Sequence, residues 1–181
     1  MGLPHVQNSK AAREHFEPVV NSLFRVTFIL PTSIKGEPLL TEHVISVTGF
    51  KDPGPEAVQQ QYGTAIRSYA STEVNNTQVL DFTMSLNLNK NQQNYVLKKI
   101  KEWRKMVFNP LTAEYGLAAD YMGQIVVERY NKKFQTIYER TIHNAWPSGE
   151  LTGIDDYDIT NHEPMQLSFQ VTGDYYSEAE L

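Results

Sequence analysis

Strict alternation of apolar and polar residues is the sequence feature that most constrains the fold of this chain. It occurs over residues 77–89 and again over residues 165–174. A period of two is typical of a β-strand, because successive side chains point to opposite faces of the sheet. Each stretch therefore predicts a strand with one face in a hydrophobic core and the other in water.

The water-facing sides of these two predicted strands are polar but carry no lysine or arginine. Their residues are Asp81, Thr83, Ser85, Asn87, Gln166, Ser168, Gln170 and Thr172. Exposed strands usually scatter lysines, which protect against edge-to-edge pairing. A channel for a polyanion requires cation-free walls, because each phosphate–lysine contact adds salt-dependent attraction. We therefore expect these residues to line a channel; chance composition on an ordinary sandwich is the alternative interpretation.

The rest of the chain predicts one helix among antiparallel strands. Further strands are expected over residues 21–30, 39–50, 122–130 and 134–146, and the closing strand over residues 165–176. The period changes between residues 91 and 108, where Val96, Ile100, Trp103 and Val107 follow helical spacing. This order predicts a mainly β fold: an antiparallel β-sandwich or partly closed barrel with a flanking helix.

The segments between these elements define the expected organisation. Residues 1–20 form an N-terminal extension, residues 21–176 the domain and residues 177–181 a C-terminal tail. Residues 49–76 are rich in Gln, Ser, Thr and Asn and are too long for a hairpin turn, so we expect an arm with residues 64–69 as one leg. A flexible link is expected over residues 112–121, and Trp146-Pro147 is interpreted as a corner where the chain leaves the sheet.

Composition excludes several classes of protein. The chain has 181 residues, a formal net charge of -5 and no cysteine, which argues against sequence-specific DNA binding and excludes disulfides, cysteine–zinc sites and thiol nucleophiles. No apolar run approaches the roughly 20 residues of a membrane helix, and the first ten residues lack the apolar region of a signal peptide. These features predict one soluble domain without membrane insertion.

Motifs for catalysis or metal binding are absent from the sequence. The five histidines lack zinc-site spacing, and the acidic run 155–158 lacks the glycine and terminal glutamate of a calcium loop. Nucleophile-elbow, P-loop and dinucleotide-binding patterns do not occur. We therefore predict no enzyme activity and no catalytic, cofactor-binding or metal-binding residue. An enzyme or small-ligand binder on a β-sandwich is the alternative from another functional class.

Cations cluster on the predicted helix. Lys98, Lys101 and Lys105 fall away from its apolar stripe, so they should lie on its outer surface. A solvated helix face and a docking face for an acidic partner protein are both consistent with this pattern.

Several segments, taken in order, resemble the tail-tube proteins of contractile-tailed bacteriophages and related injection systems. The resemblance covers roughly residues 20–176. It depends on these segments: Asn21-Ser-Leu-Phe-Arg-Val-Thr-Phe28, Ile66-Arg-Ser-Tyr69, Leu80-Asp-Phe-Thr-Met84, the helix with Trp103, Ile125-Val-Val-Glu-Arg-Tyr130, Trp146-Pro147 and residues 163–176. The order of the elements carries the resemblance, because no single segment is diagnostic.

The resemblance implies a structural virion protein without cofactors. Relatives form hexameric rings whose strands join in a ring-shaped β-barrel channel, and the stacked rings are the conduit for genome ejection. Implied partners are further copies of the chain, the tail sheath protein on the helix-bearing side, a baseplate tube initiator, and tape-measure protein and passing DNA in the lumen. The implied location is the virion tail, after assembly in the host cytoplasm. A baseplate-proximal tube protein or an injection-system tube component is the alternative within this family.

Overall fold

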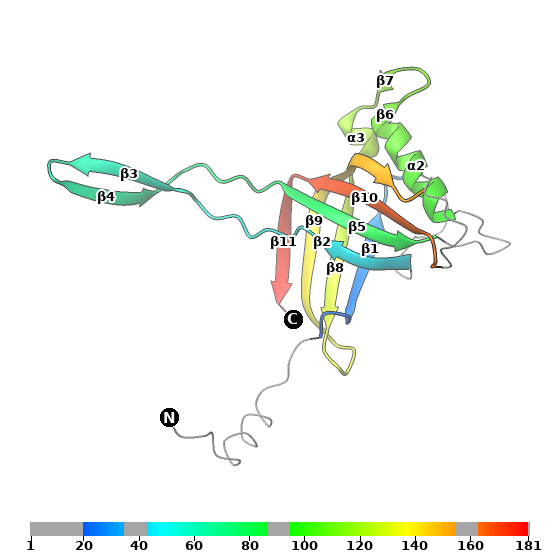
Figure 1. Ribbon diagram of the computed structural model, residues 1–181, viewed down its shortest axis with the longest axis horizontal. Coiled ribbons are helices and arrows are strands. Elements are labelled where there is room, and N and C mark those ends of the chain that lie inside the picture. The colour runs from blue at the N-terminus through cyan, green and yellow to red at the C-terminus, as the bar shows by residue number, and fades with distance from the viewer. Residues whose placement is uncertain (1–19, 35–42, 87–94, 155–162, 181) are drawn as a thin grey trace, which may run out of the picture.

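The computed structural model describes residues 20–34, 43–86, 95–154 and 163–180. Most of these residues form antiparallel strands (Figure 1). The elements are β1 (Phe24–Ile29), β2 (Val44–Thr48), β3 (Ala57–Tyr62), β4 (Ala65–Ala70), β5 (Gln78–Ser85), α2 (Tyr95–Val107), β6 (Phe108–Asn109), β7 (Glu114–Tyr115), α3 (Ala118–Tyr121), β8 (Gly123–Tyr130), β9 (Thr136–Thr152), β10 (Gln166–Gly173) and β11 (Tyr175–Glu180). The predicted mainly β fold with a flanking helix is confirmed.

Two sheets share the long strand β9. Its first part pairs with β8 on one side and β11 on the other, which gives a sheet in the order β1–β8–β9–β11. Its last part pairs with β10 and belongs to a second sheet in the order β9–β10–β5–β2. Within the described residues the two sheets form a sandwich and do not close into a barrel.

The core lies between the two sheets and under α2. Phe82 of β5 contacts Phe28 and Phe169, with ring centroids 5.2 and 5.5 Å apart. The helix adds Trp103, whose indole N–H donates a hydrogen bond to the carbonyl of Tyr121 over 2.7 Å. The fully or almost fully buried apolar residues are Val26, Phe28, Leu80, Phe82, Met84, Val96, Ile100, Trp103, Ile125, Ile142, Ala145, Leu167, Phe169 and Val171. Most of the alternating apolar residues predicted from sequence therefore face the core, whereas Met165 is 39% exposed and Leu88 lies outside the described residues.

The interpretation of Trp146-Pro147 as the corner where the chain leaves the sheet holds for the first sheet, because the pairing of β9 with β8 ends at Ala145. β9 continues through these residues to Thr152, and Pro147 pairs with Val171 of β10. Proline lacks an N–H, which suits the outer strand of a sheet. The strand therefore passes from one sheet to the other here, after Asn144 adopts a left-handed conformation at φ 54°.

The prediction of a single closing strand over residues 165–176 is wrong. The chain turns at Asp174, whose amide donates to the carbonyl of His143, and then forms β11 beside β9. Gly173 permits this turn, because a Cβ there would lie 2.3 Å from Cγ2 of Ile142. Residues 177–180, expected to be a tail, thus belong to a strand. The expected flexible link over residues 112–121 likewise contains β7 and α3.

The arm contains the hairpin β3–β4, in which β4 is close to the expected leg over residues 64–69. In Figure 1 the hairpin projects to the left of the sandwich, whereas α2 lies at its upper right. Every residue of both arm strands is exposed. Neither of the described helices is long and apolar enough to cross a membrane.

Candidate functional site

The predicted channel-lining residues form one surface, which we call the polar face. β5 and β10 are antiparallel neighbours, so Gln166 lies opposite Ser85, Ser168 opposite Thr83, and Gln170 opposite Asp81. The amide of Gln170 donates a hydrogen bond to the Asp81 carboxylate over 3.0 Å. These side chains are half-buried or exposed. Seven of the eight predicted residues, the set without Asn87, are therefore adjacent, and Asn87 lies outside the described residues.

The polar face extends onto the two flanking strands. On β2, Ser46 lies opposite Thr83 and Thr48 opposite Asp81. On β9, Ser148 and Thr152 lie opposite Gln170 and Ser168, and the hydroxyls of Ser148 and Thr172 are 2.7 Å apart. The sequence did not identify these residues, because the order of polar and apolar residues in β2 and at the end of β9 does not show which strands lie beside them. The surface thus spans four strands of one sheet.

Charge on the polar face is negative where it is present. A shallow depression of about 320 Å³ on it is lined by the two carboxylates Asp81 and Glu150 together with hydroxyl and amide side chains. The residues named on the polar face include no lysine or arginine. At its edge, Arg104 of α2 donates to the carbonyl oxygens of Ser148 and Gly149 over 3.4 and 2.8 Å. An anionic chain would therefore meet no side-chain cation among the residues named on this face.

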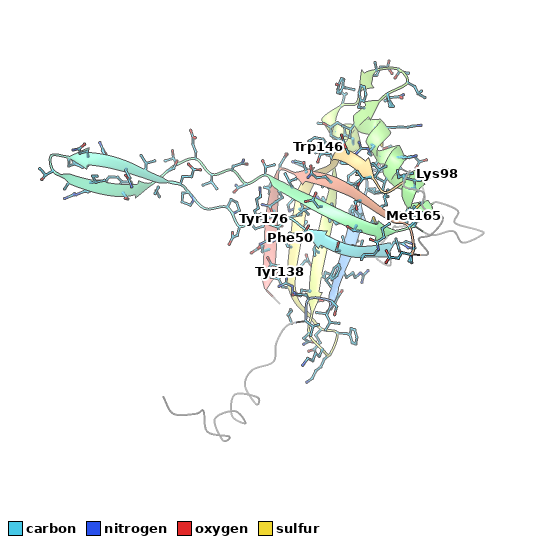
Figure 2. All side chains as sticks on the ribbon, viewed as in Figure 1. Phe50, Lys98, Tyr138, Trp146, Met165 and Tyr176 are labelled. Carbon is cyan, nitrogen blue, oxygen red and sulfur yellow. The ribbon has the colours of Figure 1, made fainter. Side chains whose placement is uncertain are left out.

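The lysines predicted to lie on the outer surface of the helix are exposed. Lys98 projects from α2 in Figure 2, and Lys101 and Lys105 are also exposed. Lys99 differs, because it is 7% exposed and its ammonium lies 3.5 Å from the carboxylate of Glu102. The other three lysines therefore present their charges to solvent.

Exposed apolar side chains in the segment beside α2 were not predicted. Leu111, Tyr115 and Leu117 are 84, 79 and 73% exposed in the segment that follows the helix. Tyr115 contacts Phe108 across the β6–β7 pair, with ring centroids 4.8 Å apart. These residues follow neither a period of two nor a helical period, so the sequence offered no pattern by which to place them.

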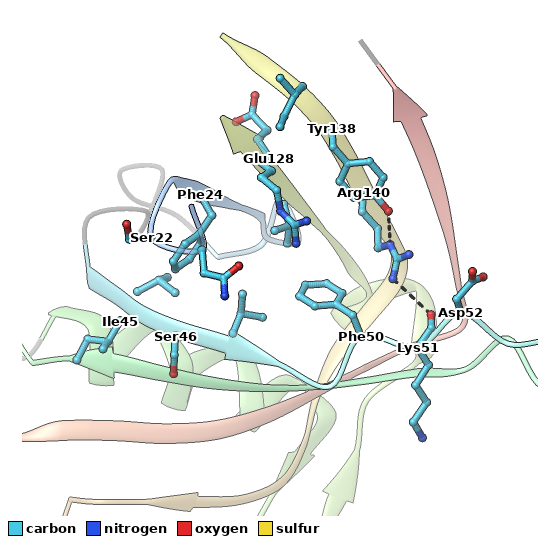
Figure 3. A pocket seen from close by; sticks show the side chains of 16 residues that line it. Ser22, Phe24, Ile45, Ser46, Phe50, Lys51, Asp52, Glu128, Tyr138 and Arg140 are labelled. Carbon is cyan, nitrogen blue, oxygen red and sulfur yellow. Dashed lines mark hydrogen bonds between the residues drawn. The ribbon is translucent and has the colours of Figure 1, made fainter. Parts of the chain in front are cut away.

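A cavity of about 1220 Å³ opens between the two sheets at the end of the sandwich where β1, β2, β8 and β9 meet (Figure 3). Its walls are apolar at Phe24, Val47, Phe50, Val127 and Ile137, and polar near Arg140. A small-ligand site is the alternative function that such a cavity would serve.

Two polar side chains of this cavity, Tyr138 and Arg140, belong to a hydrogen-bonded cluster. Arg140 donates to the Tyr138 hydroxyl over 2.9 Å, is paired with Glu178 and lies 4.4 Å from the ring centroid of Tyr176. A hydrogen bond from Tyr138, with one from Arg140, lowers the pKa of Glu178. Burial, with the hydrogen bond to Glu178, raises the pKa of Tyr138. In the described part of the chain no group of three or more His, Cys, Asp or Glu residues could hold a metal ion.

Both ends of the arm are anchored to the sandwich. The fully buried side chain of Gln78 accepts a hydrogen bond from the amide of Lys51 over 3.1 Å and donates to the carbonyl of Asn76 over 3.2 Å. The Tyr176 hydroxyl donates to the Asp52 carboxylate over 2.7 Å. Gly49 begins the arm at φ 97°, and a Cβ there would lie 2.3 Å from the carbonyl oxygen of Val79. The hairpin therefore leaves the body from a fixed root.

Comparison with known proteins identifies the fold. No protein-family model matches the sequence, and no curated protein sequence matches it. The structure is similar to the tube-terminating cap of the anti-feeding prophage, with 15% identity, coverage of 92% of this chain and 93% of that one, and a TM-score of 0.65. A chain of the sheath–tube complex of the extracellular contractile injection system PVC is also similar, with 14% identity, coverage of 96 and 97% and a TM-score of 0.64.

A third similar structure comes from the SPP1 tail tube, with 9% identity, coverage of 91% of this chain and 80% of that one, and a TM-score of 0.56. All three likenesses extend over nearly the whole of this chain. At these identities they establish the fold, and the resemblance to tail-tube proteins predicted from sequence is confirmed at that level.

Proposed function

We propose that this chain, which has the fold of tail-tube proteins, is a structural subunit of the inner tube of a contractile tail or injection system. The observation that carries the proposal is the polar face, which spans four strands and has no lysine or arginine among its residues. An isolated globular protein has no need of such a surface. A conduit for a polyanion needs such a surface, because its wall must be hydrated and must not bind the polyanion tightly.

Ring formation follows from the open edges of the same sheet. β2 pairs with β5 on one side, and the end of β9 pairs with β10 on one side. Within the described residues no further strand pairs with their other sides, and strands of neighbouring copies would complete the sheet there. Hexameric rings that stack into a tube are the proposed assembly, with the polar face of every copy on the lumen.

The proposed partners follow from the two sides of the subunit. The lumen side would meet passing DNA and a tape-measure protein. The exposed lysines of α2 would face a tail sheath protein, and a baseplate tube initiator would contact the first ring. The corresponding particle is a phage virion assembled in the host cytoplasm, with genome ejection as its task. The protein acts in this scheme without catalysis.

A second assembly within the same family is a single ring that ends or begins a tube. The similarity to a tube-terminating cap over 92% of this chain favours this candidate alongside the bulk tube subunit. Such a protein would present one stacking surface that is not continued by another copy.

Electron microscopy of the purified protein tests the proposal. Long hollow filaments support the bulk tube subunit, and isolated rings support a terminating or baseplate-proximal component. Persistent monomers at high concentration would contradict both and favour a β-sandwich binder built around the cavity near Arg140. A variant with residues 55–69 deleted is the matched control, because it should keep the sandwich and lose ring stacking.

A further inference from the structure

The cavity between the two sheets leaves one end of the hydrophobic core open. Protein interiors contain few voids larger than a water molecule, whereas this cavity is about 1220 Å³. Its apolar wall residues are only half-buried, and most of them also pack against the buried core. They are Phe24, Val44, Val47, Phe50, Val127 and Ile137. This end of the sandwich therefore presents an apolar surface that suits a further segment of protein.

The described part of the chain begins at the mouth of this cavity. Asn21 and Ser22 line it, and Ser22 lies beside it in Figure 3. The amide of Leu23 donates to the carbonyl of Val20 over 3.2 Å, which closes a turn across these residues. The carbonyl of Leu23 accepts from the amide of Tyr130 over 2.9 Å, so the turn is fixed to the end of β8. The chain preceding Val20 therefore starts at the cavity.

The sequence that precedes Val20 contains a suitable apolar side chain. Residues 1–19 lie outside the described part of the chain, and Phe16 is their only aromatic residue. A chain spans at most about 3.3–3.6 Å per residue, so the four residues from Phe16 to Val20 cover up to about 14 Å. Phe16 is thus within reach of the cavity interior from the fixed turn.

Charge at the cavity also matches this segment. Arg129 lies opposite Phe24 in the β1–β8 register, so its side chain is on the same side of the sheet. Its guanidinium lies 5.9 Å from the ring centroid of Tyr138, another lining residue. Glu17 directly follows Phe16 in the sequence. A carboxylate at this position has the charge that complements Arg129.

We propose that the segment around Phe16 occupies the cavity of its own chain, with the Phe16 ring between the two sheets and the Glu17 carboxylate at Arg129. The docked segment completes the core of each subunit by itself, so the proposal goes beyond the assembly of a tube. It also assigns the cavity to protein instead of a small ligand. Other possible occupants are a second copy of the chain and residues 35–42, which carry Leu39 and Leu40.

Pairs of cysteines test the docking, because the chain has none of its own. The test variant combines Phe16→Cys with Val47→Cys on the cavity wall. The matched control combines Phe16→Cys with Arg25→Cys, because Arg25 is exposed and follows Phe24 on the opposite face of β1. Both full-length variants are oxidised at micromolar concentration, and mass spectrometry follows disulfide formation. If Val47→Cys did not fold, Ile137→Cys on the other wall would replace it.

The Val47 pair should form a disulfide within one chain at least about tenfold faster than the control pair, since docking raises the effective concentration of the two thiols. Unfolding in urea should abolish this preference. Equal rates, or a faster control, would overturn the proposal. Disulfides between two chains would assign the cavity to a second copy and would also overturn it.

Thermal unfolding provides a second measurement that leaves the cavity wall unchanged. Phe16→Ser should lower the melting temperature of the free subunit by several degrees, because a buried ring is lost. Val6→Ser, farther from the turn, should leave the melting temperature unchanged. A decrease for Leu40→Ser but not for Phe16→Ser would assign the cavity to residues 35–42 and overturn the proposal. All these measurements use the free subunit, so their outcome is independent of whether the protein forms rings or filaments.

Discussion

Truncation of Trp103 tests how the helix is held on the sandwich. The side chain is 1% exposed, and its indole N–H is bonded to the carbonyl of Tyr121. Replacing a buried tryptophan with alanine costs about 3–5 kcal/mol through lost contacts and the cavity left behind. Loss of the hydrogen bond adds about 1 kcal/mol. Trp103→Ala should therefore lower the free energy of unfolding by about 4–6 kcal/mol, a large part of the roughly 5–15 kcal/mol typical of a domain.

Urea unfolding followed by circular dichroism measures this change for the free subunit. Trp103→Phe is the first control, because it keeps a buried ring and loses the N–H donor; it should cost clearly less than alanine. Lys101→Ala, on the exposed side of the same helix, should change the free energy by no more than about 0.5 kcal/mol. A loss below about 1.5 kcal/mol for Trp103→Ala would refute the packing argument, since replacing even a smaller buried side chain such as leucine with alanine costs about 2 kcal/mol or more.

Further predictions concern the lumen, the outer side, the arm and acid stability. Thr83→Lys and Gln170→Lys should leave the fold intact and slow the passage of DNA, most strongly at low salt. Gln135→Lys, in the turn between β8 and β9, should leave the passage of DNA unchanged. Fully infectious particles from both lumen variants would refute the channel assignment. Replacing Lys98, Lys101 and Lys105 with Glu should change the melting temperature little and weaken co-assembly with the sheath protein. Lys99→Glu should destabilise the fold, because Lys99 is paired with Glu102. Unchanged sheath binding of the triple variant at low salt would contradict a docking role for the three lysines. Deleting residues 55–69 should give a folded monomer that no longer stacks, and amide exchange already slow in the arm of free monomers would argue against an arm ordered by assembly. Hydrogen bonds lower the pKa of Glu178, so its contribution to stability is present at neutral pH and is lost as the pH falls through that lowered pKa. The melting temperatures of Glu178→Gln and the unsubstituted protein should therefore differ more at pH 7 than at pH 3.

Local periodicity explains why much of the fold could be predicted. The alternation around Phe82 and Phe169 placed both rings in the core, and they contact each other there. The spacing of Val96, Ile100 and Trp103 identified the buried side of α2. These predictions depend only on the direction in which successive side chains leave the backbone, which each segment sets for itself.

Pairing between distant segments could not be predicted in the same way. The path of β9 through Trp146 and Pro147 depends on β10, which supplies the partner strand. The turn at Asp174 and the formation of β11 likewise depend on the free side of β9. A proline and a Gly-Asp pair indicate a bend in many contexts, and only the neighbouring strands determine whether the sheet continues through it.

The alternation of residue types already specifies the chemistry of each strand face: apolar residues on one side and polar residues without lysine or arginine on the other, at positions such as Thr83 and Gln170. Strand pairing brings these faces together and adds Ser46, Thr48, Ser148 and Thr152 to them. The physical reason is that the direction of a side chain is a local property of the backbone, whereas the register between strands follows from the burial of the whole core at once.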